Sequence, residues 1–99
     1  FDGSMGSQHL WTMLERHAPP DVERHLIIGP WDHGQAYVGG GSGYGSHHWG
    51  EAGAFDLAAT RLAFFDRHLK GVGPGPALPD RTLCFLTGAD RWLAAPAYP

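Results

Sequence analysis

The 99-residue sequence has one cysteine, few charges and no long apolar run. Cys84 stands alone, which excludes a disulfide framework within the chain. Charged residues make up 17% of the sequence, the net charge is −3, and Lys and Arg are scattered singly. We therefore expect neither a nucleic-acid partner nor binding to an anionic membrane surface. No apolar run approaches the roughly 20 residues that cross a membrane as a helix.

Glycine and proline, in contrast, are abundant, with 15 and 8 residues respectively. The chain opens on Phe1 without a methionine, on what reads as the tail of a strand. A chain of this length buries only a modest share of its surface, so a self-sufficient core is not expected. We interpret the sequence as a piece cut from a longer protein.

Apolar residues at helical spacing predict two helices, over Gly3 to Arg16 and over Ala54 to Leu69. Ser4 or Ser7 is available to cap the first helix. Gly71 is expected to end the second helix, because glycine favours the left-handed residue that follows a helix. Apolar side chains mark one face of that helix, namely Phe55, Ala59, Leu62, Phe65 and Leu69.

Two strands are predicted as well. Leu26 to Ile28 is a continuous apolar run, typical of a strand covered on both faces in a parallel sheet, and Pro30 stops it because proline cannot donate to a ladder. Thr82 to Thr87 reads as a second strand, after which Gly88 opens a turn that carries Trp92. Alternation of helices with a buried strand indicates an α/β fold.

The first of these strands leads to a candidate site. Trp31, Asp32 and His33 follow it in a loop at the carboxyl edge of the sheet, where open α/β folds bind their ligands. His33 is suited to shuttle protons there, and the alternative is a loop histidine bonded to the backbone. Trp31 either lines a pocket and shields the histidine from water or packs at a domain interface.

Asp2 is the candidate partner of His33. It lies where an upstream strand would end, and neighbouring parallel strands are about 5 Å apart, so an Asp–His contact is expected. In a Ser-His-Asp triad the carboxylate orients the imidazole, and α/β-hydrolases carry the three residues in the order Ser, Asp, His. The alternative for Asp2 is a turn former or a helix cap.

The chain offers no nucleophile of the expected kind. None of its four serines has the flanking glycines of a G-x-S-x-G elbow, so the serine of a triad would lie upstream. Cys84 lies in an apolar strand, where a buried structural thiol is expected.

Metal and nucleotide sites are not predicted either. The seven histidines show no H-x-x-x-H spacing, and the glycine-rich segment from Gly39 to Gly45, expected to be a mobile surface loop, lacks the Lys-Ser/Thr of a P-loop.

Four motifs in order carry a family resemblance. They are Phe1-Asp2-Gly3, Gly29-Pro30-Trp31-Asp32-His33, the segment from Arg61 to Gly71 that contains Phe-Phe-Asp-Arg-His-Leu-Lys-Gly, and Thr87-Gly88-Ala89-Asp90-Arg91-Trp92. Over essentially the whole chain, this pattern resembles the CocE/NonD hydrolases, which include cocaine esterase, α-amino acid ester hydrolases, cephalosporin acylases and X-Pro dipeptidyl-peptidases.

The resemblance implies a fold and an activity. Residues 1–73 would be the C-terminal portion of an α/β-hydrolase catalytic domain, residues 74–81 a linker, and residues 82–99 the start of a β-sandwich of jelly-roll type. Asp2 would be the acid and His33 the base of a serine hydrolase triad acting on an ester, an amide or an X-Pro peptide, without metal or organic cofactor.

The remainder of the parent domain would supply the serine, so this chain alone is expected to be inactive. The alternative is a non-catalytic structural or interaction module that keeps the end of a hydrolase fold.

Overall fold

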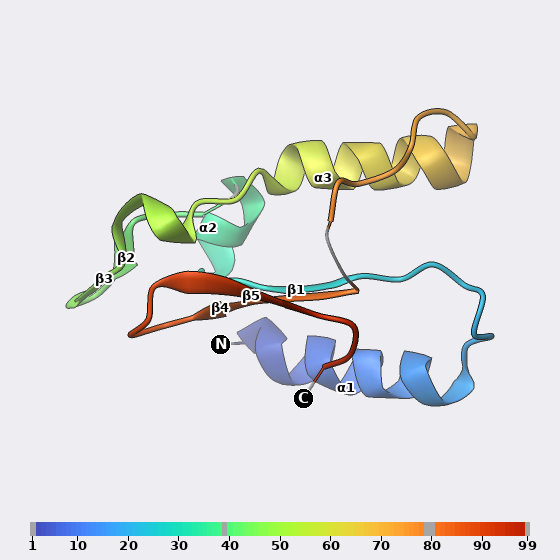
Figure 1. Cartoon of the computed structure of the whole chain (residues 1–99). Coiled ribbons are helices and arrows are strands. Elements are labelled where there is room, and N and C mark those ends of the chain that lie inside the picture. The colour runs from blue at the N-terminus through green and yellow to red at the C-terminus, as the bar shows by residue number, and fades with distance from the viewer. Residues whose placement is uncertain (1, 39, 79–80, 99) are drawn as a thin grey trace.

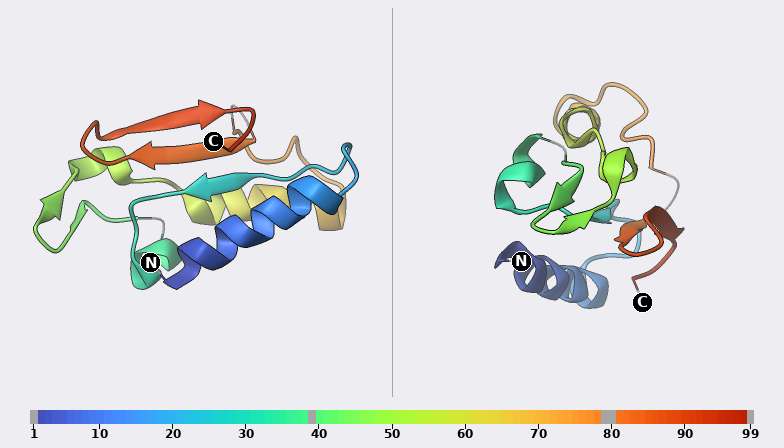
Figure 2. Two further views of the ribbon diagram at one scale, coloured as in Figure 1. Left: turned by 90° about the horizontal axis from the view of Figure 1, so that it is seen from below. Right: turned by 90° about the vertical axis from the view of Figure 1, so that its left-hand side faces the viewer.

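The computed structural model describes residues 2–38, 40–78 and 81–98, with side chains from Gly6 onward. Its centre is a three-stranded mixed sheet in the order β1-β4-β5. Helix α1 (Asp2–His17) lies on one side of this sheet and helix α3 (Leu57–Phe65) on the other, as the views in Figures 1 and 2 agree. The chain is therefore a small α/β arrangement of helices around a mixed sheet, as the sequence predicts at this coarse level.

The predicted N-terminal helix is confirmed and is slightly longer than expected. Because the helical backbone already includes Asp2, Ser4 and Ser7 lie inside α1 rather than at its cap. The core contact of α1 is Trp11, which is only 5% exposed. The residues whose spacing predicted the helix are partly exposed, namely Leu10, Met13 and Leu14.

Both predicted strands are present in one sheet. Strand β1 (Leu26–Ile28) runs parallel to β4 (Thr82–Leu86), with Leu26 opposite Thr82. Strand β4 also pairs antiparallel with β5 (Arg91–Ala95). Strand β1 precedes residues 74–81 and strands β4 and β5 follow them, and all three strands belong to one sheet. The predicted division into two domains at that segment stays a prediction.

Trp92 was expected in the turn that Gly88 opens, and this was wrong. The turn is complete by Asp90, and Trp92 lies on β5, opposite Phe85 of β4. Gly88 and Asp90 have φ angles of 88° and 49°, so the tight reversal uses two left-handed residues. The short turn lets the chain pair back on β4 at once and places the indole over the sheet.

Two small elements occupy the segment after β1. Helix α2 (His33–Val38) begins where the sequence predicted a loop, and the glycine-rich segment contains strand β2 (Gly43–Tyr44), which pairs with β3 (His47–His48). A 3₁₀ turn, η1 (Gly50–Gly53), follows. The expectation that Gly39 to Gly45 holds no regular element was therefore wrong.

The second predicted helix is confirmed with a later start. The Asp56 carboxylate accepts a hydrogen bond from the amide of Ala59 at 2.9 Å, so α3 begins at Leu57. The helix continues as a π-helix, η2 (Asp66–Lys70), and Gly71 ends it with φ at 69°. Much of the predicted apolar face is uncovered in this chain, with Leu62, Phe65 and Leu69 all more than half exposed.

The core is small and lies where the sheet meets the helices. Its buried apolar side chains are Trp11, Leu26, Leu57, Leu83 and Phe85. Within the described ranges, no helix combines the length and apolar character that crossing a bilayer requires.

Candidate functional site

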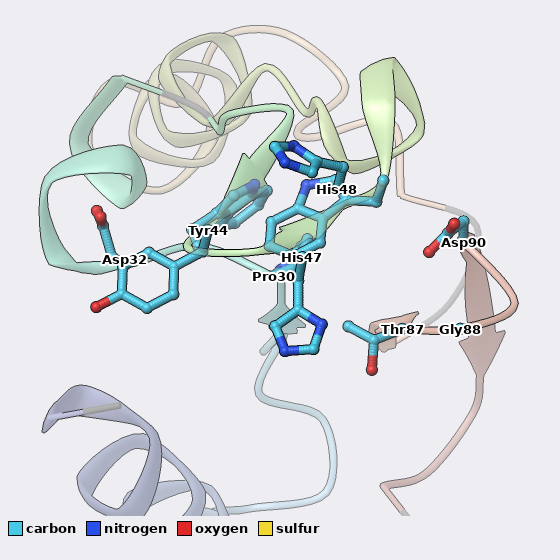
Figure 3. A pocket seen from close by; sticks show the side chains of 11 residues that line it. Pro30, Asp32, Tyr44, His47, His48, Thr87, Gly88 and Asp90 are labelled. Carbon is cyan, nitrogen blue, oxygen red and sulfur yellow. The ribbon is translucent and has the colours of Figure 1, made fainter.

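A pocket of about 480 Å³ opens at the carboxyl end of β1. Three stretches of chain line it: the exit from β1, the β2–β3 hairpin and the turn after β4 (Figure 3). The lining residues are Gly29, Pro30, Trp31, Asp32, Tyr44, His47, His48, Trp49, Thr87, Gly88 and Asp90. The pocket lies at the edge of the sheet where the sequence predicts the site, and its role as a functional site stays a prediction.

Asp32 is held in the pocket wall by the start of α2. Its carboxylate accepts a hydrogen bond from the amide of Gln35 at 2.7 Å, and its own amide donates to the Gln35 side chain at 3.2 Å. This reciprocal arrangement is a capping box, which satisfies free amides at a helix start. Asp32 therefore caps α2 and also places a negative charge at the pocket.

His33 lies one residue beyond the pocket wall. As the first residue of α2 it is exposed, and its ring meets the ring of Tyr37 edge to face, with the centroids 5.3 Å apart. It is absent from the residues that line the pocket. The imidazole is thus accessible from outside, which a general base requires.

Asp2, the predicted partner of His33, belongs by its backbone to the first turn of α1, and its side chain lies outside the described residues. Figures 1 and 2 show the N-terminal end of α1 near α2, below the same end of the sheet. The contact between the Asp2 carboxylate and His33 stays a prediction.

Trp31 both lines the pocket and packs in an aromatic cluster. Its ring lies 5.7 Å from Trp92 and 6.3 Å from Phe55, measured between centroids. Phe85 extends the cluster, with its ring 5.3 Å from Trp92 and 6.3 Å from Trp49. The Trp31 indole is therefore packed against other rings, while its location at a domain interface and its shielding of His33 both stay predictions.

Each indole of this aromatic cluster also finds a backbone acceptor at 2.8 Å. Trp31 donates to the carbonyl of Gly53, Trp92 to that of Ala52, and Trp49 to that of Gly41. Buried indole N–H groups need such partners. Two of the bonds hold the η1 turn against the end of the sheet, and the third joins Trp49 to the glycine-rich segment beside the pocket.

The sequence reasoning missed the lining residues on the far side of the pocket. Tyr44 and His47 come from a hairpin that the glycine content concealed, and Asp90 comes from the turn before β5. A usable signal was present, since aromatic residues bracket the glycines on both sides and Trp92 follows a tight turn.

Cys84 lies at intermediate depth on β4, and burial raises the pKa of its thiol above the ordinary value. A protonated thiol is a poor nucleophile. In the ranges with described side chains, no three His, Cys, Asp or Glu residues are grouped so that they could hold a metal ion.

The pocket carries two carboxylates, and no described Lys or Arg in its walls balances their negative charge. Asp32 and Asp90 line it, Lys and Arg are absent from its walls, and neither carboxylate forms an ion pair with a residue that the structure describes. By contrast, Glu15, Glu23 and Asp66 each have a cationic partner.

No protein-family model, curated protein or solved structure matches this chain significantly.

Proposed function

We propose that this chain is the C-terminal part of the α/β-hydrolase domain of a serine hydrolase that resembles the CocE/NonD enzymes. Its substrate would be an ester, an amide or a short X-Pro peptide. His33 would be the general base and Asp2 the carboxylate that supports it.

The observation that carries this proposal is the position of His33. It follows β1, a strand in parallel pairing, at the carboxyl end of that strand, and α1 leads into the same strand from the N-terminal side. An α/β-hydrolase likewise carries its histidine after a strand of the sheet and after the carboxylate in chain order. The exposed ring leaves room for a serine hydroxyl supplied by the rest of the domain.

The proposed reaction is acyl transfer to water. His33 removes the proton of the serine hydroxyl while the oxygen attacks the substrate carbonyl carbon, and then gives that proton to the departing alcohol or amine. In the second half, His33 takes a proton from water, the hydroxide attacks the acyl carbon, and the proton returns to the serine oxygen. Asp2 would stabilise the imidazolium present in each half.

The test uses the longer chain that the proposal requires, with p-nitrophenyl acetate as substrate. His33→Ala should lower kcat about 10³-fold or more, and Asp2→Asn should lower it strongly with little change in KM. His9→Ala, which removes an exposed histidine of α1, is the matched control and should leave turnover unchanged. Unchanged turnover of the His33 variant would sink the proposal.

A second candidate function, a non-catalytic interaction module, is favoured by the exposed apolar side chains on α3 and on η2, which continues it. Leu62 and Leu69 are 60% and 78% exposed, more than a finished surface needs. Sequencing the coding region before Phe1 separates the two functions. A G-x-S-x-G motif there supports the hydrolase, and a start codon directly before Phe1 supports the module.

A further inference from the structure

The pocket at the end of β1 combines aromatic walls with negative charge. Trp31, Tyr44 and Trp49 supply ring surface, and the carboxylates of Asp32 and Asp90 supply charge. Figure 3 shows the two carboxylates on opposite sides of the opening with His47 between them. A ligand that enters from either side therefore meets a carboxylate.

The charge of these carboxylates is not balanced by described parts of the protein. Asp32 accepts its hydrogen bond from a neutral amide, and neither Asp32 nor Asp90 pairs with a described Lys, Arg or His. Like-signed groups around an apolar cavity raise the local concentration of the opposite charge. The pocket thus favours a cation over a neutral or anionic ligand.

The geometry argues against a metal ion as that cation. His47, His48, Asp32 and Asp90 all line the pocket, yet the described side chains include no group of three that could bind one metal. A metal also gains nothing from ring surface, whereas an ammonium group is attracted to the face of a Trp or Tyr ring within about 6 Å.

We propose that this pocket binds a small organic cation, a primary ammonium carried on an aromatic body. The volume of about 480 Å³ is in the range of pockets that hold small molecules. The aromatic body would lie against Trp31 and Trp49, and the negative charges of Asp32 and Asp90 would both attract the ammonium from opposite sides of the pocket. The inference does not depend on the proposed hydrolase activity, because His33 is outside the pocket wall.

The test follows the indole N–H signals of the 99-residue chain by ¹H–¹⁵N NMR during titration with phenethylammonium. The signals of Trp31 and Trp49 should shift and saturate with a Kd on the order of 1 mM, as expected for so small a ligand. Trp11, on α1 and outside the pocket, is the internal control and should not shift. Absence of a shift at Trp31 and Trp49 up to about 20 mM would overturn the proposal.

Neutral 2-phenylethanol has the same ring and chain without the charge, so it isolates the role of the carboxylates. It should bind at least about threefold more weakly than phenethylammonium. Asp90→Asn should weaken the ammonium about threefold and leave the alcohol unchanged, since Asn tolerates the left-handed backbone of this position.

Two further variants complete the design. Asp32→Asn should act like Asp90→Asn, and Asp21→Asn, in the exposed turn after α1, should change the affinity of neither ligand. Retention of the Trp11 signal shows that each variant is folded. Equal affinity for the ammonium and the alcohol would contradict the proposal, as would equal loss of both ligands in the Asp90 and Asp32 variants.

Discussion

Different kinds of interaction hold the two ends of β1 in place. At the amino end, Glu15 accepts from Arg24 and Arg81 at 2.7 Å, and Glu23 meets Arg67 at 2.7 Å. At the carboxyl end, five aromatic rings pack together and indole N–H groups bond to the backbone. At the amino end the carboxylates of Glu15 and Glu23 are paired with arginines. At the carboxyl end the carboxylates of Asp32 and Asp90 line the pocket and form no ion pair with a described residue.

The difference has an energetic basis. Partly exposed ion pairs contribute about 0–1 kcal/mol each, so the amino end orients its segments without much stabilising them. Aromatic pairs contribute about 0.5–1.5 kcal/mol beyond the area that they bury. We infer that the carboxyl end supplies more of the stability and that the pocket exists because large rigid rings leave space between them.

The largest effect is expected from Trp92→Ala. This variant removes the ring that contacts Trp31, Phe55 and Phe85 together with a hydrogen bond to Ala52, so it should cost about 3 kcal/mol of unfolding free energy. Urea unfolding followed by circular dichroism measures the loss. Trp92→Phe keeps a ring and should lose only about 1 kcal/mol. Equal losses in the two variants would mean that ring packing contributes nothing.

A smaller effect is expected at the amino end from Glu23→Gln. The hydrogen bond from His25 lowers the pKa of the Glu23 carboxyl most, and the charges of Arg67 and His68 lower it further, against a burial that raises it. Because the Glu23 side chain is 29% exposed, we expect a loss below about 1 kcal/mol at pH 7.

The pH dependence of that loss follows from the lowered pKa. Ionised Glu23 contributes its full stabilisation above the ordinary value of 4.5, and the contribution disappears as the pH falls through the lower pKa of the folded chain. Urea midpoints of the parent and Glu23→Gln chains should therefore differ at pH 7 and converge as the pH falls below the lowered pKa of Glu23. Glu51→Gln, an exposed control, should show no such convergence.

The smallest effect concerns Cys84, between the two ends. Burial raises the pKa of its thiol above the ordinary 9.0, so the folded chain should react with Ellman's reagent more slowly at pH 8 than the chain unfolded in urea. The rate should still be rising above pH 9.0. Identical rates in folded and unfolded chains would show that the sheet does not protect Cys84.

Local signals predicted the local elements of this fold. Leu26 to Ile28 forms the expected strand because a short apolar run is stabilised by burial in a sheet. Gly71 ends the second helix because glycine adopts a left-handed backbone at no steric cost. The capping box at Asp32 and Gln35 could also have been recognised from its three-residue spacing.

The pocket itself could not be predicted locally. It depends on the pairing of β1 with β4, which are 56 positions apart at Leu26 and Thr82, and on a hairpin within a glycine-rich segment. Neither periodicity nor turn chemistry encodes such distant contacts. The Asp2–His33 pair rests likewise on a long-range arrangement and stays a prediction.

The neighbouring carbonyls of Ala52 and Gly53 accept hydrogen bonds from two indole N–H groups. One belongs to Trp92 on β5 and the other to Trp31, which follows β1. Displacing the η1 turn would therefore break both hydrogen bonds at once. The exit from β1 and strand β5 are therefore linked through this turn. We therefore expect a ligand of the proposed site to enter by side-chain rotation at Tyr44 and His47, which are exposed on the hairpin, while Trp31 keeps its position.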